Sequence, residues 1–138
     1  CENEAVNLIL SSFAGRARKK EIKIKIQCAI PADLTVSESD LCVLLSNALE
    51  NALHACVPLA AEGRSCEIDV NFYERNKHLF LQVVNDCKAP IKFQNGIPVS
   101  DMEGHGIGVQ SICAIVQRYG GVFSFAEKDG KFTLRLSL

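Results

Sequence analysis

The stretch SESDLCVLLSNALENA, residues 37–52, decides how the middle of this chain folds. Its first residue, Ser37, is followed three positions later by Asp40, a spacing typical of residues that cap the start of a helix. Apolar side chains then recur at helical spacing and form one stripe: Leu41, Leu44, Leu45, Ala48, Leu49 and Ala52. The stretch therefore predicts a long helix with one buried face, and we expect this helix to end at Pro58.

Sequences that alternate between apolar and polar residues predict strands on both sides of this helix. The segments with this pattern are residues 22–30, 67–73, 78–84, 122–127 and 131–137. A charged turn at 74–77 joins two of them, and the hairpin dipeptide Asp129-Gly130 joins two others. The sequence thus predicts two hairpins and one isolated strand.

Two more helices are expected, one near each end of the chain. The first has apolar residues at helical spacing and a basic C-terminal end; its predicted buried face is Ala5, Leu8, Ile9, Phe13 and Ala17. The other covers residues 109–119 and ends at Gly120-Gly121. No periodic pattern is present between residues 85 and 106, and a loop of that length in a compact domain is usually functional.

The order of these elements is helix, strand, helix, two strands, long loop, helix, two strands. It predicts an α/β two-layer sandwich, with a mixed, mostly antiparallel five-stranded sheet and helices on one face. A doubly wound parallel fold would need a helix between successive strands, which the two hairpins lack. The length of 138 residues is about that of one domain.

Composition excludes several classes of function. The net charge of −1, from 15 basic and 16 acidic residues, gives no basic field for nucleic acid. The uncharged stretch at 51–61 is shorter than the roughly 18 residues of a membrane span, so we expect no membrane contact by this chain. The seven cysteines contain no CxxC pair, which is a poor pattern for disulfides or zinc, and we expect reduced, packed thiols.

The central helix also carries a polar stripe. Asn47, Glu50, Asn51 and His54 are spaced so that all four project from one side of it. An ordinary solvated face is the alternative, but such faces usually carry Lys and Glu, whereas asparagine is a weak helix former. Amide oxygens beside a carboxylate suit Mg²⁺ that takes its other ligands from water and phosphates.

The stretch Gly104-His-Gly106-Ile-Gly108 stands at the end of the long loop, where the third helix begins. Glycines allow backbone amides to approach an anion, and a helix N-terminus adds free N–H donors, so this is a phosphate-cradle pattern. It is neither a Rossmann fingerprint nor a P-loop. A flexible loop end with a steric need for glycine is the alternative.

Together these stretches resemble the ATP-binding domain of the GHKL superfamily. Residues 46–52 (SNALENA) look like its N box, and residues 104–112 (GHGIGVQSI) look like its second glycine box. The resemblance runs from about Ile22 to the closing hairpin and includes Val84-Asn85-Asp86 at a strand end. Within the superfamily, the chain is most similar to catalytic domains of bacterial sensor histidine kinases of the peptide quorum-sensing kind.

The resemblance implies roles for individual residues. Asn51 matches the asparagine that coordinates Mg²⁺, Asn47 contacts metal or phosphate, and Asn85 meets the adenine amine. The loop at 87–103 corresponds to a lid over the nucleotide, with Lys88 or Lys92 available to phosphate. The full set of implied ATP-contacting residues is Asn47, Asn51, His54, Asn85, Lys88, Gly104, His105, Gly106, Ile107, Gly108 and Val109.

The chain departs from the family pattern in ways that bear on its reaction. Cys87 stands where the family has glycine, and Asn85 stands where it usually has an acid. Members that hydrolyse ATP place a glutamate one turn before the metal-binding asparagine, where this chain has Asn47, whose amide is no base. This favours phosphoryl transfer, with Glu50 left as a possible base beside Asn47 and Asn51.

The implied function is ATP-dependent protein phosphorylation by a two-component sensor histidine kinase. For His54, His78 and His105 structural roles are expected, so the acceptor histidine belongs to a dimerisation domain upstream of Cys1. Residues 1–20 would be the end of its helix and 21–138 the ATP-binding domain. A homodimeric full-length protein, a response regulator as partner and a cytoplasmic domain anchored to the cell membrane complete the expectation.

Two other functions remain open at this point. One is an anti-sigma-factor-like serine kinase with the same domain, and the other is a non-catalytic nucleotide-binding or dimer module, which Asn85 and Cys87 suggest.

Overall fold

A computed structural model describes residues 2–88, 90–99 and 106–138 of the chain. Its helices and strands are α1 (Glu4–Lys19), β1 (Lys23–Ala29), α2 (Glu38–Ala61), β2 (Glu67–Arg75), β3 (His78–Asp86), β4 (Phe93–Gln94), β5 (Ile97–Pro98), α3 (Gly106–Arg118), β6 (Val122–Lys128) and β7 (Lys131–Ser137).

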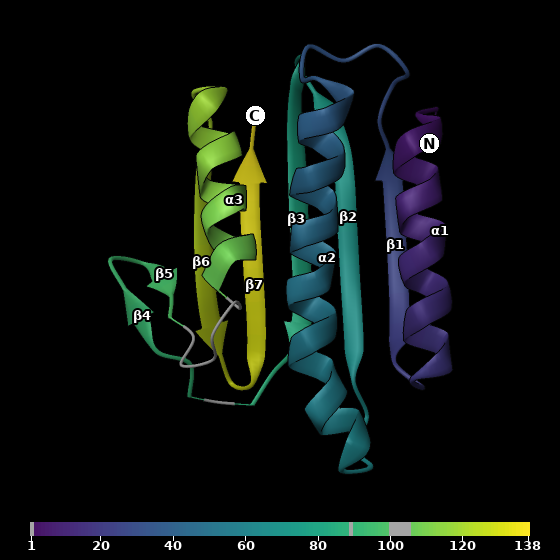
Figure 1. The fold of residues 1–138 in the computed structure, drawn as a ribbon, viewed down its shortest axis with the longest axis vertical. Coiled ribbons are helices and arrows are strands. Elements are labelled where there is room, and N and C mark those ends of the chain that lie inside the picture. The colour runs from purple at the N-terminus through teal and green to yellow at the C-terminus, as the bar shows by residue number, and fades with distance from the viewer. Residues whose placement is uncertain (1, 89, 100–105) are drawn as a thin grey trace.

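The predicted two-layer sandwich is confirmed. In the described part of the chain, five strands form one sheet in the order β1-β2-β3-β7-β6, and the helices α1, α2 and α3 lie on one of its faces (Figure 1). β1 runs parallel to β2, because the chain returns through α2 before it forms β2. All other pairs in this sheet are antiparallel, and short turns connect β2 to β3 and β6 to β7.

α2 is the central helix of the core. The Ser37 hydroxyl accepts a hydrogen bond from the Asp40 backbone N–H at 3.1 Å, so the predicted cap is present. Every member of the predicted apolar stripe is buried: Leu41, Leu44, Leu45, Ala48, Leu49 and Ala52. By length and composition alone α2 could cross a membrane, but buried core helices pass the same test, and its apolar face packs inside the domain.

The prediction that this helix ends at Pro58 is wrong, because α2 continues to Ala61. A proline inside a helix removes one backbone hydrogen bond and costs roughly 3 kcal/mol. Leu59, directly after the proline, is fully packed in the core, and its burial offsets part of that cost. The N–H of Glu62 then closes the helix on the carbonyl of Pro58 at 3.2 Å.

α1 is present, but part of its predicted buried face is wrong. Phe13 and Ala17 are buried as expected, whereas Leu8 is 73% exposed and Val6 and Leu10 are buried in its place. α1 packs against both α2 and β1, and these two neighbours together select the buried face. The division of the chain at residue 20 stays a prediction.

The long segment between β3 and α3 contains a small hairpin that the sequence reading missed. Strands β4 and β5 pair around Asn95 and Gly96, both at positive φ, which is the signature of a tight two-residue hairpin turn. Phe93 of this hairpin stacks on Phe132 of β7, with ring centroids 6.4 Å apart.

α3 begins at Gly106, earlier than the predicted Val109, because the glycine motif itself enters the helix.

The described cysteines are free thiols, as predicted. Within the described part of the chain there is also no cluster of three or more His, Cys, Asp or Glu side chains that could hold a metal. Burial raises the pKa of the Cys56 thiol to about 12, so this cysteine stays protonated and unreactive.

Candidate functional site

The polar stripe of α2 meets the glycine motif at the start of α3. A Cβ atom added at Gly108 would lie 3.2 Å from Oδ1 of Asn47, so the first turn of α3 rests directly on this amide. A Cβ atom at this position would require the Asn47 side chain to move by a few tenths of an ångström. The structure therefore brings together two motifs that lie about sixty residues apart in the sequence.

A hydrogen-bonded cluster at the other end of α3 fixes this arrangement. The Tyr119 hydroxyl donates to Oδ2 of Asp40 at 2.6 Å, and Arg118 pairs with Oδ1 of the same carboxylate at 2.7 Å. The backbone N–H of Ser37 donates to the Tyr119 oxygen at 3.1 Å. Tyr119 and Arg118 hold the pKa of Asp40 below its usual value. The cluster ties the end of α3 to the start of α2.

Glu50 lies on the opposite flank of α2 and faces α1. Nη1 of Arg16 donates to its Oε1 at 2.6 Å, and Nη2 lies 3.4 Å from its Oε2. The same Arg16 guanidinium lies over the ring of Phe13, 4.8 Å from the ring centroid. Its hydrogen bond to Glu50 raises the pKa of Arg16. His54, one turn after Glu50, is exposed and has Nε2 3.8 Å from the Glu50 carboxylate.

Asn85 is buried near the end of β3, with 1% of its surface exposed. Its Nδ2 donates to the backbone carbonyl of Asp86 at 2.9 Å, which fixes the orientation of the amide. The Asp86 carboxylate accepts the backbone N–H of Glu67 at 2.8 Å and pairs with Lys131 at 2.7 Å. This pairing raises the pKa of Lys131. Asp86, the residue directly after Asn85, is thus bound by residues of both neighbouring strands, β2 and β7.

α2 passes over this end of β3. Cys56, five residues after Asn51 on the same helix, has its Sγ 3.5 Å from the Asp86 carbonyl oxygen. Just beyond β3, the N–H of Cys87 donates to the Gly130 carbonyl at 2.9 Å, and Lys88 pairs with Glu62 at 3.0 Å. Lys88 therefore binds the C-terminal end of α2.

The remaining predicted residues are placed as follows. Asn51 is half-buried on α2, one turn after Asn47. Gly106 and Ile107 begin α3, and Val109 is buried in its first turn. Gly104 and His105 lie outside the described residues. Asn47 and Asn51 thus present neutral amides beside a helix N-terminus, a combination that can accept an anion and a hydrated cation together.

Some residues that shape the site were missed in the sequence. Arg16 belongs to the basic C-terminal end of the first predicted helix, and its partner Glu50 is 34 residues away, so residue spacing gives no signal of this pair. The pairing of Lys131 with Asp86 follows from strand register, which places the two residues opposite each other on β7 and β3. Sequence alternation predicts strands but does not specify this register.

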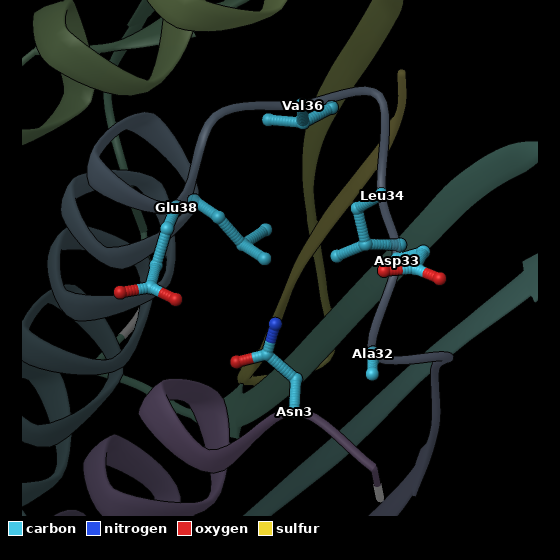
Figure 2. Close-up of a pocket in the computed structure, with 7 residues that line it drawn as sticks. Asn3, Ala32, Asp33, Leu34, Val36 and Glu38 are labelled. Carbon is cyan, nitrogen blue, oxygen red and sulfur yellow. The ribbon is translucent and has the colours of Figure 1, made fainter.

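Two cavities in the described residues lie away from these side chains. One, of about 220 Å³, lies between Asn3, the residue directly before α1, and the loop that leads into α2 (Figure 2). Asn3 points into this region and caps α1 by accepting the Val6 N–H at 3.0 Å. The other, of about 380 Å³, lies between α1 and β1. Neither cavity is lined by a residue of the predicted ATP site.

A sequence-family model described as "GHKL domain" matches residues 36–138. These residues include both motifs, the end of β3 and all strands except β1. Among proteins with curated functions, none matches this chain in sequence.

Solved structures of histidine kinases share this fold. The catalytic domain of histidine kinase ThkA superposes with a TM-score of 0.71 and 16% identity, over 98% of this chain and 89% of that one. The mycobacterial sensor histidine kinase MprB gives 0.65 and 17%, over 96% and 93%. Full-length ShkA, solved in complex with AMPPNP, gives 0.65 and 16%, over 96% of this chain and 28% of that chain.

Proposed function

The chain belongs to the GHKL domain family, and on that premise we propose that it is the Mg²⁺·ATP-binding catalytic domain of a two-component sensor histidine kinase. It would transfer the γ-phosphoryl group of ATP to a histidine outside the described domain. The observation that carries this proposal is the contact between Asn47 and Gly108, because it joins the amide-bearing helix to the glycine-rich helix start.

The donor set at this junction fits a nucleotide with its metal. The backbone N–H groups at the start of α3 would bind phosphate oxygens, and the dipole of α3 favours their negative charge. Asn51 would coordinate Mg²⁺ and Asn47 would contact metal or phosphate, since a neutral amide oxygen suits a cation that keeps several waters. Bound Mg²⁺ would neutralise charge on the phosphates.

Asn85 would select adenine. Because its Nδ2 is used by the Asp86 carbonyl, Oδ1 remains as the acceptor that a bound base meets. The exocyclic amine of adenine donates a hydrogen bond, whereas guanine carries a carbonyl oxygen at that position. We therefore expect the domain to prefer ATP to GTP.

Phosphoryl transfer is better supported than hydrolysis. Asn47 offers no base to activate water, and the carboxylate of Glu50 is bound by Arg16 on the flank that faces α1. A base role for Glu50 requires this ion pair to open. Positioning of the nucleotide and charge neutralisation would supply most of the catalysis.

The partners follow from the proposed reaction. An upstream dimerisation domain would present the acceptor histidine, a response regulator would receive the phosphoryl group in a phosphorelay, and the full-length protein would be a homodimer. The domain would lie in the cytoplasm of a bacterial cell, with the full-length protein anchored to the membrane. The solved histidine kinases with the same fold support, in general terms, the dimer and the response-regulator partner of this proposal.

A titration with a fluorescent ATP analogue, with and without Mg²⁺, tests the proposal. The wild-type chain should bind the analogue in a Mg²⁺-dependent manner, and Asn51→Ala should weaken binding at least about tenfold when Mg²⁺ is present. Asn71→Ala is the matched control, because this asparagine lies on β2, on the sheet face opposite the helices, and should bind as the wild type does.

Two results would contradict the assignment. No binding at about 1 mM analogue would refute a nucleotide-binding function. Binding that needs no metal and is unchanged in Asn51→Ala would remove Asn51 from its role and favour a non-catalytic nucleotide-binding module.

The identity of the phosphorylated residue is a separate question. Labelled ATP added to a longer chain should give an acid-labile, base-stable phosphoramidate if the acceptor is histidine. An acid-stable phosphate on a protein substrate would favour the serine kinase alternative.

A further inference from the structure

β1 is an edge strand whose outer side is not paired within the described residues. It bonds to β2 on one side and ends the sheet order. Its helix-facing residues Ile24, Ile26 and Cys28 are only half-buried, whereas Ile68, at the equivalent position on β2, is fully buried. An edge strand of this kind can accept a further strand.

A groove runs beside this edge, beneath α1. Its volume is about 380 Å³, and its lining residues come from one face of α1 and from β1: Asn7, Leu10, Ser11, Ala14, Arg18, Ile26 and Cys28. Figure 1 shows α1 at the end of the helical layer, beside β1. A strand added to β1 would therefore place its helix-facing side chains in this groove, against Leu10, Ala14 and Ile26.

The surroundings of the groove are strongly basic. The end of α1 and β1 carry the exposed basic residues Arg18, Lys19, Lys20, Lys23 and Lys25, with the acidic Glu21 among them. Arg16 is exposed as well, but it pairs with Glu50 of α2. Lys23 and Lys25 project from the sheet face opposite the helices. Across the β1–β2 pair, Nζ of Lys25 already lies 3.9 Å from Oε1 of Glu67. Acidic residues on an added strand could pair with the lysines in the same way.

We propose that the α1–β1 groove is a docking surface for an extended acidic segment of a partner protein, which adds to the sheet beside β1. The segment alternates apolar residues, which enter the groove, with acidic residues, which face Lys23 and Lys25. Main-chain hydrogen bonds to β1 supply affinity, and the charge pattern supplies specificity.

A second copy of this chain is a poorer occupant. Pairing of β1 with another β1 would bring Lys23 and Lys25 of two copies close together, and like charges on neighbouring strands repel. Lysines on an edge strand generally discourage such self-association. They do not discourage an acidic partner.

Fluorescence anisotropy with a labelled peptide, Glu-Val-Glu-Val-Glu-Val-Glu, tests the proposal on the chain of residues 1–138. We expect saturable binding that weakens several-fold when the salt concentration rises from about 0.05 to 0.3 M, because the pairing is electrostatic at the exposed face. The same peptide with lysine in place of glutamate should not bind. Hydrogen exchange should show added protection in β1 on peptide binding, with less change in β6.

Two variants and a control locate the binding. Lys23→Glu should weaken binding at least about tenfold, since it reverses a charge that faces the peptide. Ser11→Trp should also weaken binding, because it fills the groove from an exposed position on α1. Lys128→Glu makes the same charge change on β6, at the opposite edge of the sheet, and should bind as the wild type does. Circular dichroism checks that each variant is folded.

Several outcomes would overturn the proposal. These are no saturable binding up to about 1 mM peptide, equal effects of Lys23→Glu and Lys128→Glu, or protection that appears away from β1. Sedimentation that shows a dimer disrupted by Ser11→Trp would mean that a second copy occupies the groove instead. None of these results depends on nucleotide binding, so the proposal can fail while the proposed kinase function stands.

Discussion

The two flanks of α2 bind their neighbouring helices by different chemistry. Toward α1, the contact is between charged side chains. Arg16 and Glu50 form a bidentate ion pair, and His54 lies beside it. Toward α3, midway along the helix, the contact is between a neutral amide and a glycine, Asn47 and Gly108. The charged groups on the flank that faces α3 lie at the N-terminal end of α2, where Asp40 binds Arg118 and Tyr119.

This difference separates residues that stabilise the domain from residues that can bind a ligand. A carboxylate already paired with an arginine must break that pair before it can act elsewhere. A neutral amide beside a helix N-terminus can accept a metal or phosphate without losing an ion pair. One polar stripe in the sequence thus contains both kinds of residue.

The largest expected effect concerns how α3 is joined to the sheet. Gly121→Ala would place a Cβ atom on the backbone carbonyl oxygen of Ser137, which cannot move without distorting β7. We expect a loss of about 3 kcal/mol or more in the free energy of unfolding, measured by urea denaturation. Gly120→Ala is the control: the site is open but has φ of +67°, and the cost should be only about 1 kcal/mol. Equal losses of unfolding free energy in Gly121→Ala and Gly120→Ala would show that the close approach of Gly121 to Ser137 does not fix α3 to the sheet.

The next effect tests the neutral contact itself. Gly108→Ala should lower affinity for an ATP analogue about tenfold, because its Cβ displaces the Asn47 amide, while the free energy of unfolding changes by less than about 1 kcal/mol. Gly15→Ala on α1, where the added Cβ meets nothing within 4 Å, should leave affinity unchanged and stabilise the protein by about 0.5–1 kcal/mol. Unchanged affinity in Gly108→Ala would contradict the role of this contact.

The charged flank should behave in the opposite way. Arg16→Ala should lower the free energy of unfolding by about 1 kcal/mol or less, because the ion pair is partly exposed. Nucleotide affinity should stay within about twofold of the wild type, since Arg16 binds Glu50 on the flank of α2 that faces α1. Lys19→Ala, on the same helix, controls for loss of positive charge. A large loss of affinity in Arg16→Ala would mean that the two flanks are coupled.

The smallest effect is a change in pH dependence. The pKa of Asp40 is lower in the folded protein than its ordinary value of about 3.9, so its contribution to stability is full above that value and is lost as the pH falls through the folded pKa. Tyr119→Phe removes the main hydrogen bond behind the shift. Acid unfolding of this variant should therefore begin at higher pH than in the wild type, as followed by circular dichroism. Tyr73→Phe, on β2, should leave the acid transition unchanged.

Much of the fold could be predicted because periodicity reports burial directly. The stripe of α2 and the alternation of the strands each face one dominant neighbour, so the pattern and the burial agree. α1 instead contacts both α2 and β1, and for that reason its buried face was partly misjudged at Leu8 and Leu10. The hairpin at Asn95 and Gly96 was missed although Asn-Gly is a strong turn signal, because its strands are only two residues long.

The sequence predicts which residues belong to the candidate site, but not which neighbouring helix each of them contacts. Helical spacing places Asn47, Glu50 and Asn51 on one side of α2, and that side is wide enough to face two different helices. Which residue faces which helix depends on tertiary packing. The ion pair of Glu50 with Arg16 and the contact of Asn47 with Gly108 therefore became visible only in the folded chain.

The parallel pairing of β1 also has a consequence for how the domain forms and opens. The hairpins β2–β3 and β6–β7 close through short turns, whereas β1 reaches β2 only after the whole of α2 has been placed. Closing a longer loop costs more chain entropy, so we expect β1 and α1 to join the folding domain late. The same segment should exchange its amide hydrogens soonest in the native state, which makes the basic edge of the sheet its most readily opened part.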